Sequence, residues 1–282
     1  METNKKIKSF NVVFIWISTL LAVVFIYKTT LIWLYERYVA VDSYYSHGFL
    51  IPFVTLFLIW HKRKELATAN WIYSKWGLAL IIFALFVHIA SLLTGVFFIS
   101  GFTLLLLVFG IVLFLFGKEF IKKILFPLSF LIFMFPLPLV AVNAISFPMK
   151  MFVTKSVVLI LRVFLKIPIR NEGFQIFFPN GTLTVENPCS GLRSLIVILA
   201  LGSIFSYFLK ANIEKKVLFF LLAAPVAVFS NMIRVVLLSL AVYIYGSKVA
   251  DGFFHDFTGY LVFIISFIAL YSFWRRFQCK SS

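Results

Sequence analysis

Long apolar runs recur along the whole chain, and they constrain the fold more than any other feature of the sequence. A helix rises about 1.5 Å per residue, so it needs roughly 20 apolar residues to cross a hydrocarbon core of about 30 Å. The sequence is 62% hydrophobic and 13% charged, which excludes an ordinary water-soluble domain. It predicts an all-α polytopic membrane protein with about eight transmembrane helices. The candidate spans lie at about 10–27, 45–60, 76–93, 95–117, 124–146, 189–209, 217–235 and 257–274.

The fifth candidate span and the segment after it are the least regular part of this pattern. Pro127, Pro136 and Pro138 predict a kink in the fifth span. Between residues 147 and 170 five cations recur every four to seven residues, a spacing typical of a basic amphipathic helix in the headgroup plane. We therefore expect this segment to lie at the interface rather than to form a ninth span. The chain is treated as one integral membrane domain, residues 1–282.

The positive charge is explained by membrane orientation. The net charge of +16, from 26 basic and 10 acidic residues, would suggest nucleic acid as a partner of a soluble protein. Here Lys and Arg gather in short loops, as orientation signals do, so no nucleic-acid partner is expected. With the N-terminus inside, 16 of the 26 basic residues lie on the inner side, in segments 5–8, 62–75, 118–123, 210–216 and 275–280. The sequence thus predicts a multi-pass protein of the cytoplasmic membrane, surrounded by its lipids, with both termini cytoplasmic. The first run is longer than a signal-peptide core and is interpreted as an uncleaved span.

A short polar stretch before the sixth span carries the most informative residue. Alternating β-formers around Asn180-Gly181 predict a small extracytoplasmic β-hairpin over about 173–185. This hairpin would deliver Cys189 to the start of an apolar helix. A cysteine that serves only packing would lie inside the apolar run. Cys189 instead lies at its polar end, where a helix N-terminus and Arg193 favour a nucleophilic thiolate.

Two further polar residues lie at the same predicted height in the membrane. About 20 residues, or about 30 Å of helix, separate each of Cys189, Arg234 and His255 from basic residues at the inner end of its own span. Arg234 and His255 each have a simpler interpretation. Arg234 would be an arginine that extends to the headgroups, and His255 would be a histidine in a surface loop. Together they predict one site at the outer membrane–water boundary. His88 lies mid-span and is expected to be packed.

The three residue types suit acyl transfer. A thiolate attacks an acyl carbon, an imidazole moves protons, and a guanidinium stabilises the oxyanion that develops. This chemistry predicts peptide-bond cleavage or acyl transfer through a thioester, with no metal and no cofactor. Neighbouring polar residues are supporting candidates for substrate binding: Ser190, Arg193, Asn231, Asp256 and His47.

In these residues and their order, the sequence resembles the exosortase/archaeosortase family. The matching pieces are Cys189-Ser190-Gly191-Leu192-Arg193-Ser194, Asn231-Met232-Ile233-Arg234, His255-Asp256 with Gly259, and Ser46-His47-Gly48-Phe49-Leu50-Ile51-Pro52. The resemblance covers about 40–275. It implies a membrane cysteine transpeptidase whose catalytic residues are Cys189, Arg234 and His255. It also implies substrates that are exported proteins with a C-terminal sorting signal, made of a short motif, a transmembrane helix and a basic tail. The cleaved protein would pass to an amine or lipid acceptor.

Other classes of membrane protein are the alternatives. A transporter or channel is expected to place ionisable groups near the midplane of broken helices, often within internal repeats, and no repeat is found. A lipid-linked glycan or acyl transferase could use outer-face Arg and His but has no evident need for Cys189. An intramembrane metalloprotease is disfavoured because the chain lacks H-E-x-x-H.

Overall fold

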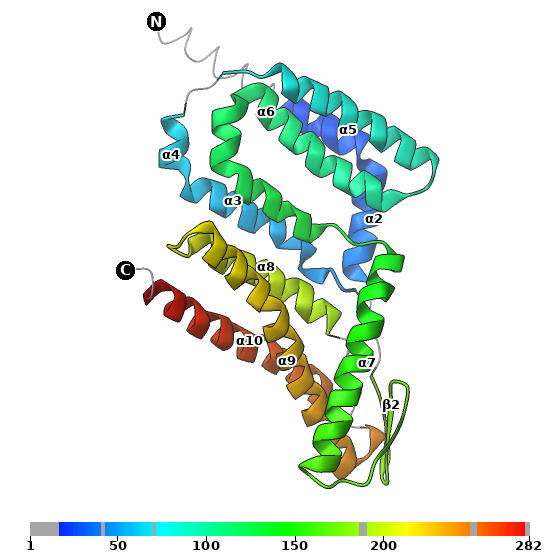
Figure 1. Ribbon diagram of the computed structural model, residues 1–282. Helices are drawn as coiled ribbons and strands as arrows, with labels where there is room; N and C mark the ends of the chain where they lie inside the picture. The colour runs from blue at the N-terminus through cyan, green and yellow to red at the C-terminus, as the bar shows by residue number, and fades with distance from the viewer. Residues whose placement is uncertain (1–16, 41–42, 70–71, 186–190, 249–252, 280–282) are drawn as a thin grey trace, which may run out of the picture. The chain divides into compact units, whose positions relative to one another are not determined.

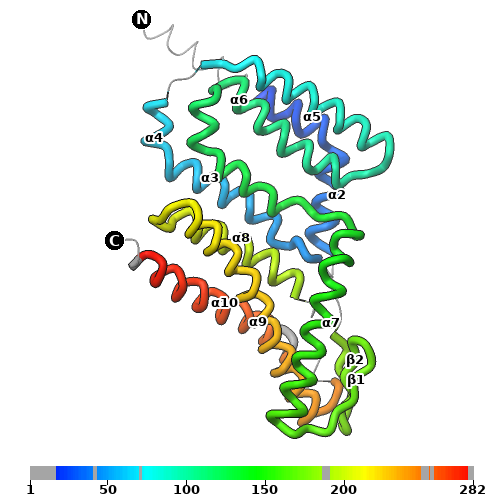
Figure 2. Tube along the Cα trace, viewed as in Figure 1, coloured from blue at the N-terminus to red at the C-terminus, as the bar shows by residue number. Residues whose placement is uncertain are grey.

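The computed structural model describes residues 17–40, 43–69, 72–185, 191–248 and 253–279, and most of them are helical (Figures 1 and 2). The chain packs into two compact units. One consists of Met1–Ala40 and Gly48–Pro136, and the other of Val41–His47 and Leu137–Ser282.

The first unit is a set of helices. Its elements are a helix over Ile17–Ile26, α2 (Lys28–Val39), α3 (Ile51–His61), α4 (Arg63–Ala67), α5 (Lys75–Leu93), α6 (Phe97–Phe130) and the 3-10 helix η2 (Leu131–Met134). A further 3-10 turn, η1 (Ser46–Phe49), lies where the chain passes between the units. Helices α5 and α6 lie side by side (Figure 1) because small residues let their backbones approach. A β-carbon on Gly77 would lie 2.2 Å from the backbone nitrogen of Phe114.

Helix α6 is broken at Gly117. This residue has φ +81°, and a β-carbon there would lie 1.9 Å from the carbonyl oxygen of Ile72. Only glycine meets both conditions, since a side chain is disfavoured at this φ and has no room. The break coincides with the predicted end of the fourth span, 95–117, but the apolar stretch continues beyond it, and Phe97–Met134 is one candidate span.

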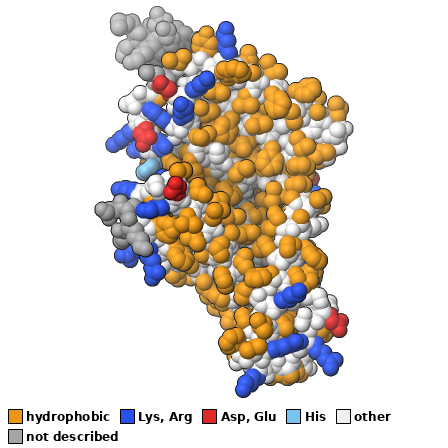
Figure 3. Space-filling view, viewed as in Figure 1, with side chains coloured by type: hydrophobic (Ala, Val, Ile, Leu, Met, Phe, Trp, Pro, Cys, Tyr) orange, Lys and Arg blue, Asp and Glu red, His pale blue; other side chains and the backbone are white. Residues whose placement is uncertain are grey.

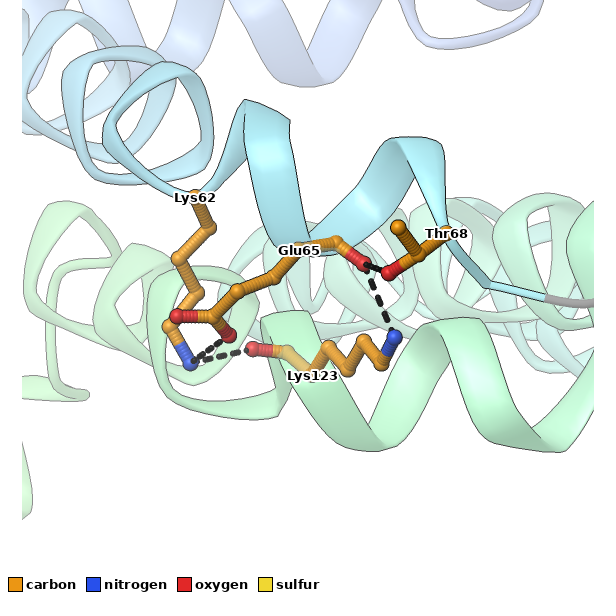
Figure 4. Close-up of polar contacts among 4 residues, drawn as sticks. All are labelled: Lys62, Glu65, Thr68 and Lys123. Atoms are coloured by element: carbon orange, nitrogen blue, oxygen red, sulfur yellow. Dashed lines mark hydrogen bonds and ion pairs between the residues drawn. The ribbon is translucent and has the colours of Figure 1, made fainter.

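Two lysines join α4 to the part of α6 that follows this break (Figure 4). Pro127 has no N–H, so the carbonyl of Lys123 loses its helical partner. Lys62 Nζ donates to that carbonyl at 2.9 Å. In return, Lys123 Nζ donates at 2.8 Å to the carbonyl of Glu65, in the last turn of α4. Lys62 thus supplies a donor to a carbonyl of α6 that lacks its helical partner, and Lys123 is a second donor to the Glu65 carbonyl, which also accepts from Thr68 Oγ1 at 3.0 Å.

A buried polar network holds the bend in the N-terminal helices. The helix over Ile17–Ile26 and α2 meet at an angle of 72°. His88 is 1% exposed, with Nδ1 2.7 Å from Ser100 Oγ and Nε2 3.2 Å from the carbonyl of Ile26. Tyr27 stacks on the His88 ring and donates to Thr103. The expectation that His88 is packed is confirmed.

The second unit joins helices to a small sheet. Its elements are α7 (Leu139–Val163), β1 (Arg170–Glu172), β2 (Gln175–Phe178), β3 (Gly181–Thr184), α8 (Leu192–Phe208), α9 (Ile213–Tyr245) and α10 (Phe253–Cys279). The sheet is antiparallel with order β1-β2-β3. Strands β2 and β3 form the predicted hairpin, with Phe178 opposite Gly181. Strand β1 was not predicted.

Two hydrophobic cores lie along α9. The first fills the bundle of α8, α9 and α10, and its buried residues include Ile198, Phe219, Ala227 and Leu270. The second joins α7, the sheet and the later part of α9. Its members include Val157, Ile176, Leu183, Met232 and Leu238. One continuous helix therefore contributes to both cores.

Multi-pass membrane embedding is supported, but the count of eight spans is not confirmed. Within the described residues, five helices are long and apolar enough to cross a membrane, or six if the bent N-terminal pair is one span. The helices over Ser46–His61 and Leu192–Phe208 are apolar but shorter than the roughly 20 residues of an ordinary span. Hydrophobic side chains cover most of the face in Figure 3. Residues such as Leu93 (84% exposed) face outward, as expected for contact with lipid.

Three predicted boundaries are wrong. The fifth predicted span, 124–146, is divided, because α6 ends at Phe130 and Pro138 precedes a new helix. That helix, α7, has 25 residues and takes in most of the stretch expected as a separate interfacial helix over 147–170. Helix α9 runs to Tyr245 instead of ending near 235, since its last turns are buried against the sheet and α7.

Candidate functional site

The start of α8 is fixed by a left-handed glycine. Gly191 has φ +81° and ψ 0° and occupies the N-cap position. Its carbonyl accepts a bond from the backbone N–H of Leu195 at 2.8 Å and another from Ser194 Oγ at 2.9 Å. The chain therefore enters α8 in one defined direction, immediately after the segment that contains Cys189.

Asn231 of α9 packs directly against this glycine. A β-carbon on Gly191 would lie 2.7 Å from Asn231 Nδ2 and 2.8 Å from its Cγ. Asn231 is 1% exposed, so its amide is enclosed between α8 and α9. The absence of a side chain at position 191 is what allows the two helices to meet here.

Arg234 lies one turn further along α9 and faces α10. Its side chain is 9% exposed, which is unusual for a permanently charged group. A β-carbon on Gly259 would lie 3.9 Å from Arg234 Nη2. Position 255 precedes position 259 by one helical turn on the same face of α10. The guanidinium thus lies close to α10 at Gly259, one helical turn after position 255.

These contacts join three chain segments that are far apart in sequence. Gly191 meets Asn231, and Arg234 meets Gly259. The entry to α8, the middle of α9 and the beginning of α10 therefore converge.

The structure places the other predicted residues as follows. Cys189 and Ser190 lie outside the described residues. His255 and Asp256 lie in the first turn of α10, and their side chains lie outside the described part. Arg193 is partly buried in the first turn of α8.

His47 belongs to the same compact unit as Arg234. Its ring stacks on Tyr45 at a centroid distance of 5.9 Å. The Tyr45 hydroxyl accepts a bond of 3.1 Å from the backbone N–H of Leu137, just before α7. His47 is therefore anchored to the start of α7 through Tyr45, and a role in the site remains a prediction.

The position of Arg234 along its helix differs from the expectation. Arg234 was expected near the end of a span, but α9 continues eleven residues beyond it, to Tyr245. The buried polar residues Ser230, Asn231 and Arg234 occur where the contribution of α9 passes from one core to the other. Ala227 belongs to the bundle core, and Met232 to the core beneath the sheet. The polar group therefore lies at the junction of two hydrophobic cores.

A second set of contacts, not foreseen from the sequence, ties the hairpin to the end of α9. Asn180 Nδ2 donates to the carbonyl of Tyr243 at 2.9 Å, and the backbone N–H of Thr182 donates to Ser247 Oγ at 2.9 Å. On the other side of β3, the N–H of Val185 bonds the carbonyl of Phe174. The strand that leads toward Cys189 is thereby fixed up to residue 185. Nothing in the local sequence singles out Ser247 for this role.

The family model for transmembrane exosortases (Exosortase_EpsH) matches residues 32–272, which is most of the chain. The chain belongs to the transmembrane exosortase family. No match was found among curated proteins or among solved structures. The range matched to the exosortase family contains Gly191, Asn231, Arg234 and Gly259, so the convergence lies inside the shared exosortase region.

The described part of this exosortase holds no group of three or more His, Cys, Asp or Glu side chains placed to bind a metal ion. It does hold the buried guanidinium of Arg234, close to the contact of Gly191 with Asn231 and to Gly259 of α10. A buried cation of this kind is suited to stabilising negative charge that develops on a substrate oxygen.

Proposed function

We propose that this exosortase is a membrane cysteine transpeptidase that cleaves the C-terminal sorting signal of exported proteins. The observation that carries the proposal is the paired contact of Gly191 with Asn231 and of Arg234 with Gly259. Both contacts tie the segments of the three proposed catalytic residues to the same stretch of α9.

The chain itself limits how far these residues can be from Arg234. Cys189 precedes Gly191 by two residues, and two residues of extended chain reach at most about 7 Å. Gly191 in turn packs on Asn231, one turn before Arg234. His255 is one turn before Gly259, which lies against Arg234. This tethering supports a common site for Cys189, Arg234 and His255.

The surroundings support a site at a membrane–water boundary. An open three-stranded sheet cannot lie in hydrocarbon, because its edge groups would lack hydrogen-bond partners. The sheet and the end of α9 therefore belong to the water side, and the α8–α10 bundle belongs to the membrane. Helix α8 has 17 residues, or about 25 Å of helix, and Lys210 follows its far end. Because basic loops favour the inner side, the site is proposed to face the outside of the cytoplasmic membrane.

In the proposed reaction, the Cys189 thiolate attacks the carbonyl carbon of the scissile peptide bond. The oxyanion that forms is stabilised by Arg234. The C–N bond breaks as the His255 imidazolium gives its proton to the leaving amine, which departs with the helix and basic tail. The exported protein is then held as a thioester of Cys189. An amine or lipid acceptor, or water, attacks this thioester, His255 takes its proton, and the thiolate is released.

The supporting residues would act around this centre. Asn231 holds the entry of α8, while Ser190, Arg193, Asp256 and His47 are proposed to line the path of the substrate. A substrate anchored by a single helix would present its scissile bond at the membrane boundary. Holding the scissile bond beside the nucleophile lowers the activation free energy by several kcal/mol in well-oriented reactions.

The experiment is mass spectrometry of the C-terminus of a co-expressed candidate substrate. We expect a truncated product with the wild-type chain, and full-length substrate with Cys189→Ala. The matched control is Cys279→Ala, which removes the other cysteine and should leave processing intact. Normal processing by Cys189→Ala would end the thioester proposal.

A further inference from the structure

An apolar groove lies between α8 and α10, at the end of the bundle away from the site. It has a volume of about 620 Å³, and its walls include Phe205, Phe208, Phe267 and Trp274. Lys210 and Gln278 are the polar residues of its lining. This volume falls within the roughly 300–1,000 Å³ usual for ligand pockets.

The aromatic wall of the groove is held in place by defined contacts. Trp274 Nε1 donates at 3.1 Å to the carbonyl of Phe205, in the last turn of α8. The Phe205 ring packs edge-on against both Trp274 and Phe267, at centroid distances of 6.0 and 5.8 Å. Ser206 Oγ bonds the carbonyl of Lys216 at 2.7 Å, which fixes the turn from α8 into α9. The groove is therefore formed before any occupant arrives.

The end of the bundle beside Lys210 is strongly basic. Its charged residues in the described part are Lys210, Glu214, Lys215, Lys216, Arg275 and Arg276. Five are cations and one is an anion. Trp274 adds an indole, a side chain common at membrane–water boundaries. The groove thus combines apolar walls, a boundary aromatic and a cationic rim.

We propose that this groove binds one anionic phospholipid, with an acyl chain along the aromatic wall and the headgroup phosphate at Lys210. Basic pockets between membrane helices are suited to acidic headgroups. Charge decides against the other apolar occupants. A sorting-signal helix that ends in a basic tail would place that tail against the five cations. A second copy of this chain in the same orientation would bring two basic ends together. Only an occupant with a negative end complements the rim.

The test measures which lipid touches Trp274. The other five tryptophans are replaced by Phe, and the full chain is placed in nanodiscs of phosphatidylcholine. Brominated phosphatidylglycerol or brominated phosphatidylcholine is then added at equal mole fraction, because bromine quenches the fluorescence of an indole that it contacts. One cation near a headgroup contributes about 1 kcal/mol, so we expect about a fivefold preference for phosphatidylglycerol at low salt, which weakens as salt is added.

Two variants locate the preference. Lys210→Gln should bring the quenching by the two lipids close to equal. Lys155→Gln, which removes an exposed lysine of α7, is the matched control and should leave the fivefold ratio unchanged. Equal quenching by both lipids in the parent chain, or an unchanged ratio in Lys210→Gln, overturns the proposal. The readout needs no substrate, so it is independent of the proposed transpeptidase activity.

Discussion

Replacing Gly191 by Ala is the most direct way to perturb the place where α8, α9 and α10 meet. Two effects add at this position. A non-glycine residue in the left-handed region costs about 1–2 kcal/mol. In addition, the new methyl group would lie 2.7 Å from Asn231 Nδ2, whereas ordinary contact begins at 3.4 Å. Asn231 or the entry of α8 must therefore move by the difference, 3.4 − 2.7, or about 0.7 Å. Displacements approaching 1 Å near a reacting group can cost about 10²-fold in rate.

Gly173 provides a control that separates the two effects. It has φ +57°, but a β-carbon there would meet no atom within 4 Å. Gly173→Ala should therefore lower the stability by about 1–2 kcal/mol and leave the reaction rate unchanged. Gly191→Ala should lose at least as much stability, because the contact with Asn231 adds to the backbone effect, and its rate should fall tens- to about a hundredfold.

The assay has two readouts in a Cys279→Ser background, where Cys189 is the remaining cysteine. One is the rate at which a co-expressed substrate loses its C-terminal segment. The other is the rate at which a membrane-impermeant maleimide labels Cys189 from outside, which needs no substrate. Adding Asn231→Gly to Gly191→Ala should remove the steric clash and recover labelling toward that of Asn231→Gly alone. If Gly191→Ala and Gly173→Ala process substrate at the same rate, the reasoning from the Asn231 contact is refuted.

Three other outcomes follow from the contacts described. Gly259→Ala should be tolerated, because its β-carbon would lie at an ordinary 3.9 Å from Arg234 Nη2, whereas Gly259→Leu should displace the guanidinium and reduce substrate cleavage; equal cleavage by both variants would contradict this. Arg234→Lys should lose about 10²-fold or more in cleavage rate while remaining folded by circular dichroism, since an ammonium does not reproduce the planar donors of a guanidinium; a rate near wild type would show that Arg234 does not contact the oxyanion. Lys62→Met should lower the free energy of unfolding by about 1–3 kcal/mol, because it leaves the Lys123 carbonyl without its donor. That loss should shrink when Pro127→Ala restores a helical N–H, and a thermal-unfolding double-mutant cycle without coupling would show that Lys62 acts otherwise.

Much of the secondary structure could be predicted because membrane helices and hairpins have strong local signals. The Asn180-Gly181 pair, flanked by alternating side chains, predicted the β2–β3 hairpin, and the structure confirms it. Gly117 ended a predicted span where α6 breaks. Helix ends were less predictable, because apolar sequence can be buried by lipid or by protein. The sequence predicts that residues 236–245 lie outside a span, but in the structure they continue α9 and pack against the sheet.

For the candidate site, residue types could be predicted but contacts could not. Arg234 could be predicted as a site residue because a charged side chain within membrane-embedded sequence is costly and is usually paired or functional. Its neighbour Gly259 was noted only as part of a resemblance, since a glycine gives no sign of which side chain it admits. The contact of Asn231 with Gly191 depends on how α8 and α9 pack, which no single segment encodes. The predicted equal height of Cys189, Arg234 and His255 stays a prediction, and Arg234 lies within its helix and not at the helix end.

The continuity of α9 through both hydrophobic cores has a mechanical consequence. The segment that carries Cys189 leaves the sheet at Val185 and enters α8 at Gly191, and each of these anchor points is braced against α9. A tilt of the sheet, or a shift of α8 along its axis, would disturb contacts with α9, the helix that also carries Arg234. Motion of the chain at Val185 or at Gly191 relative to Arg234 is therefore opposed by packing against one helix, α9.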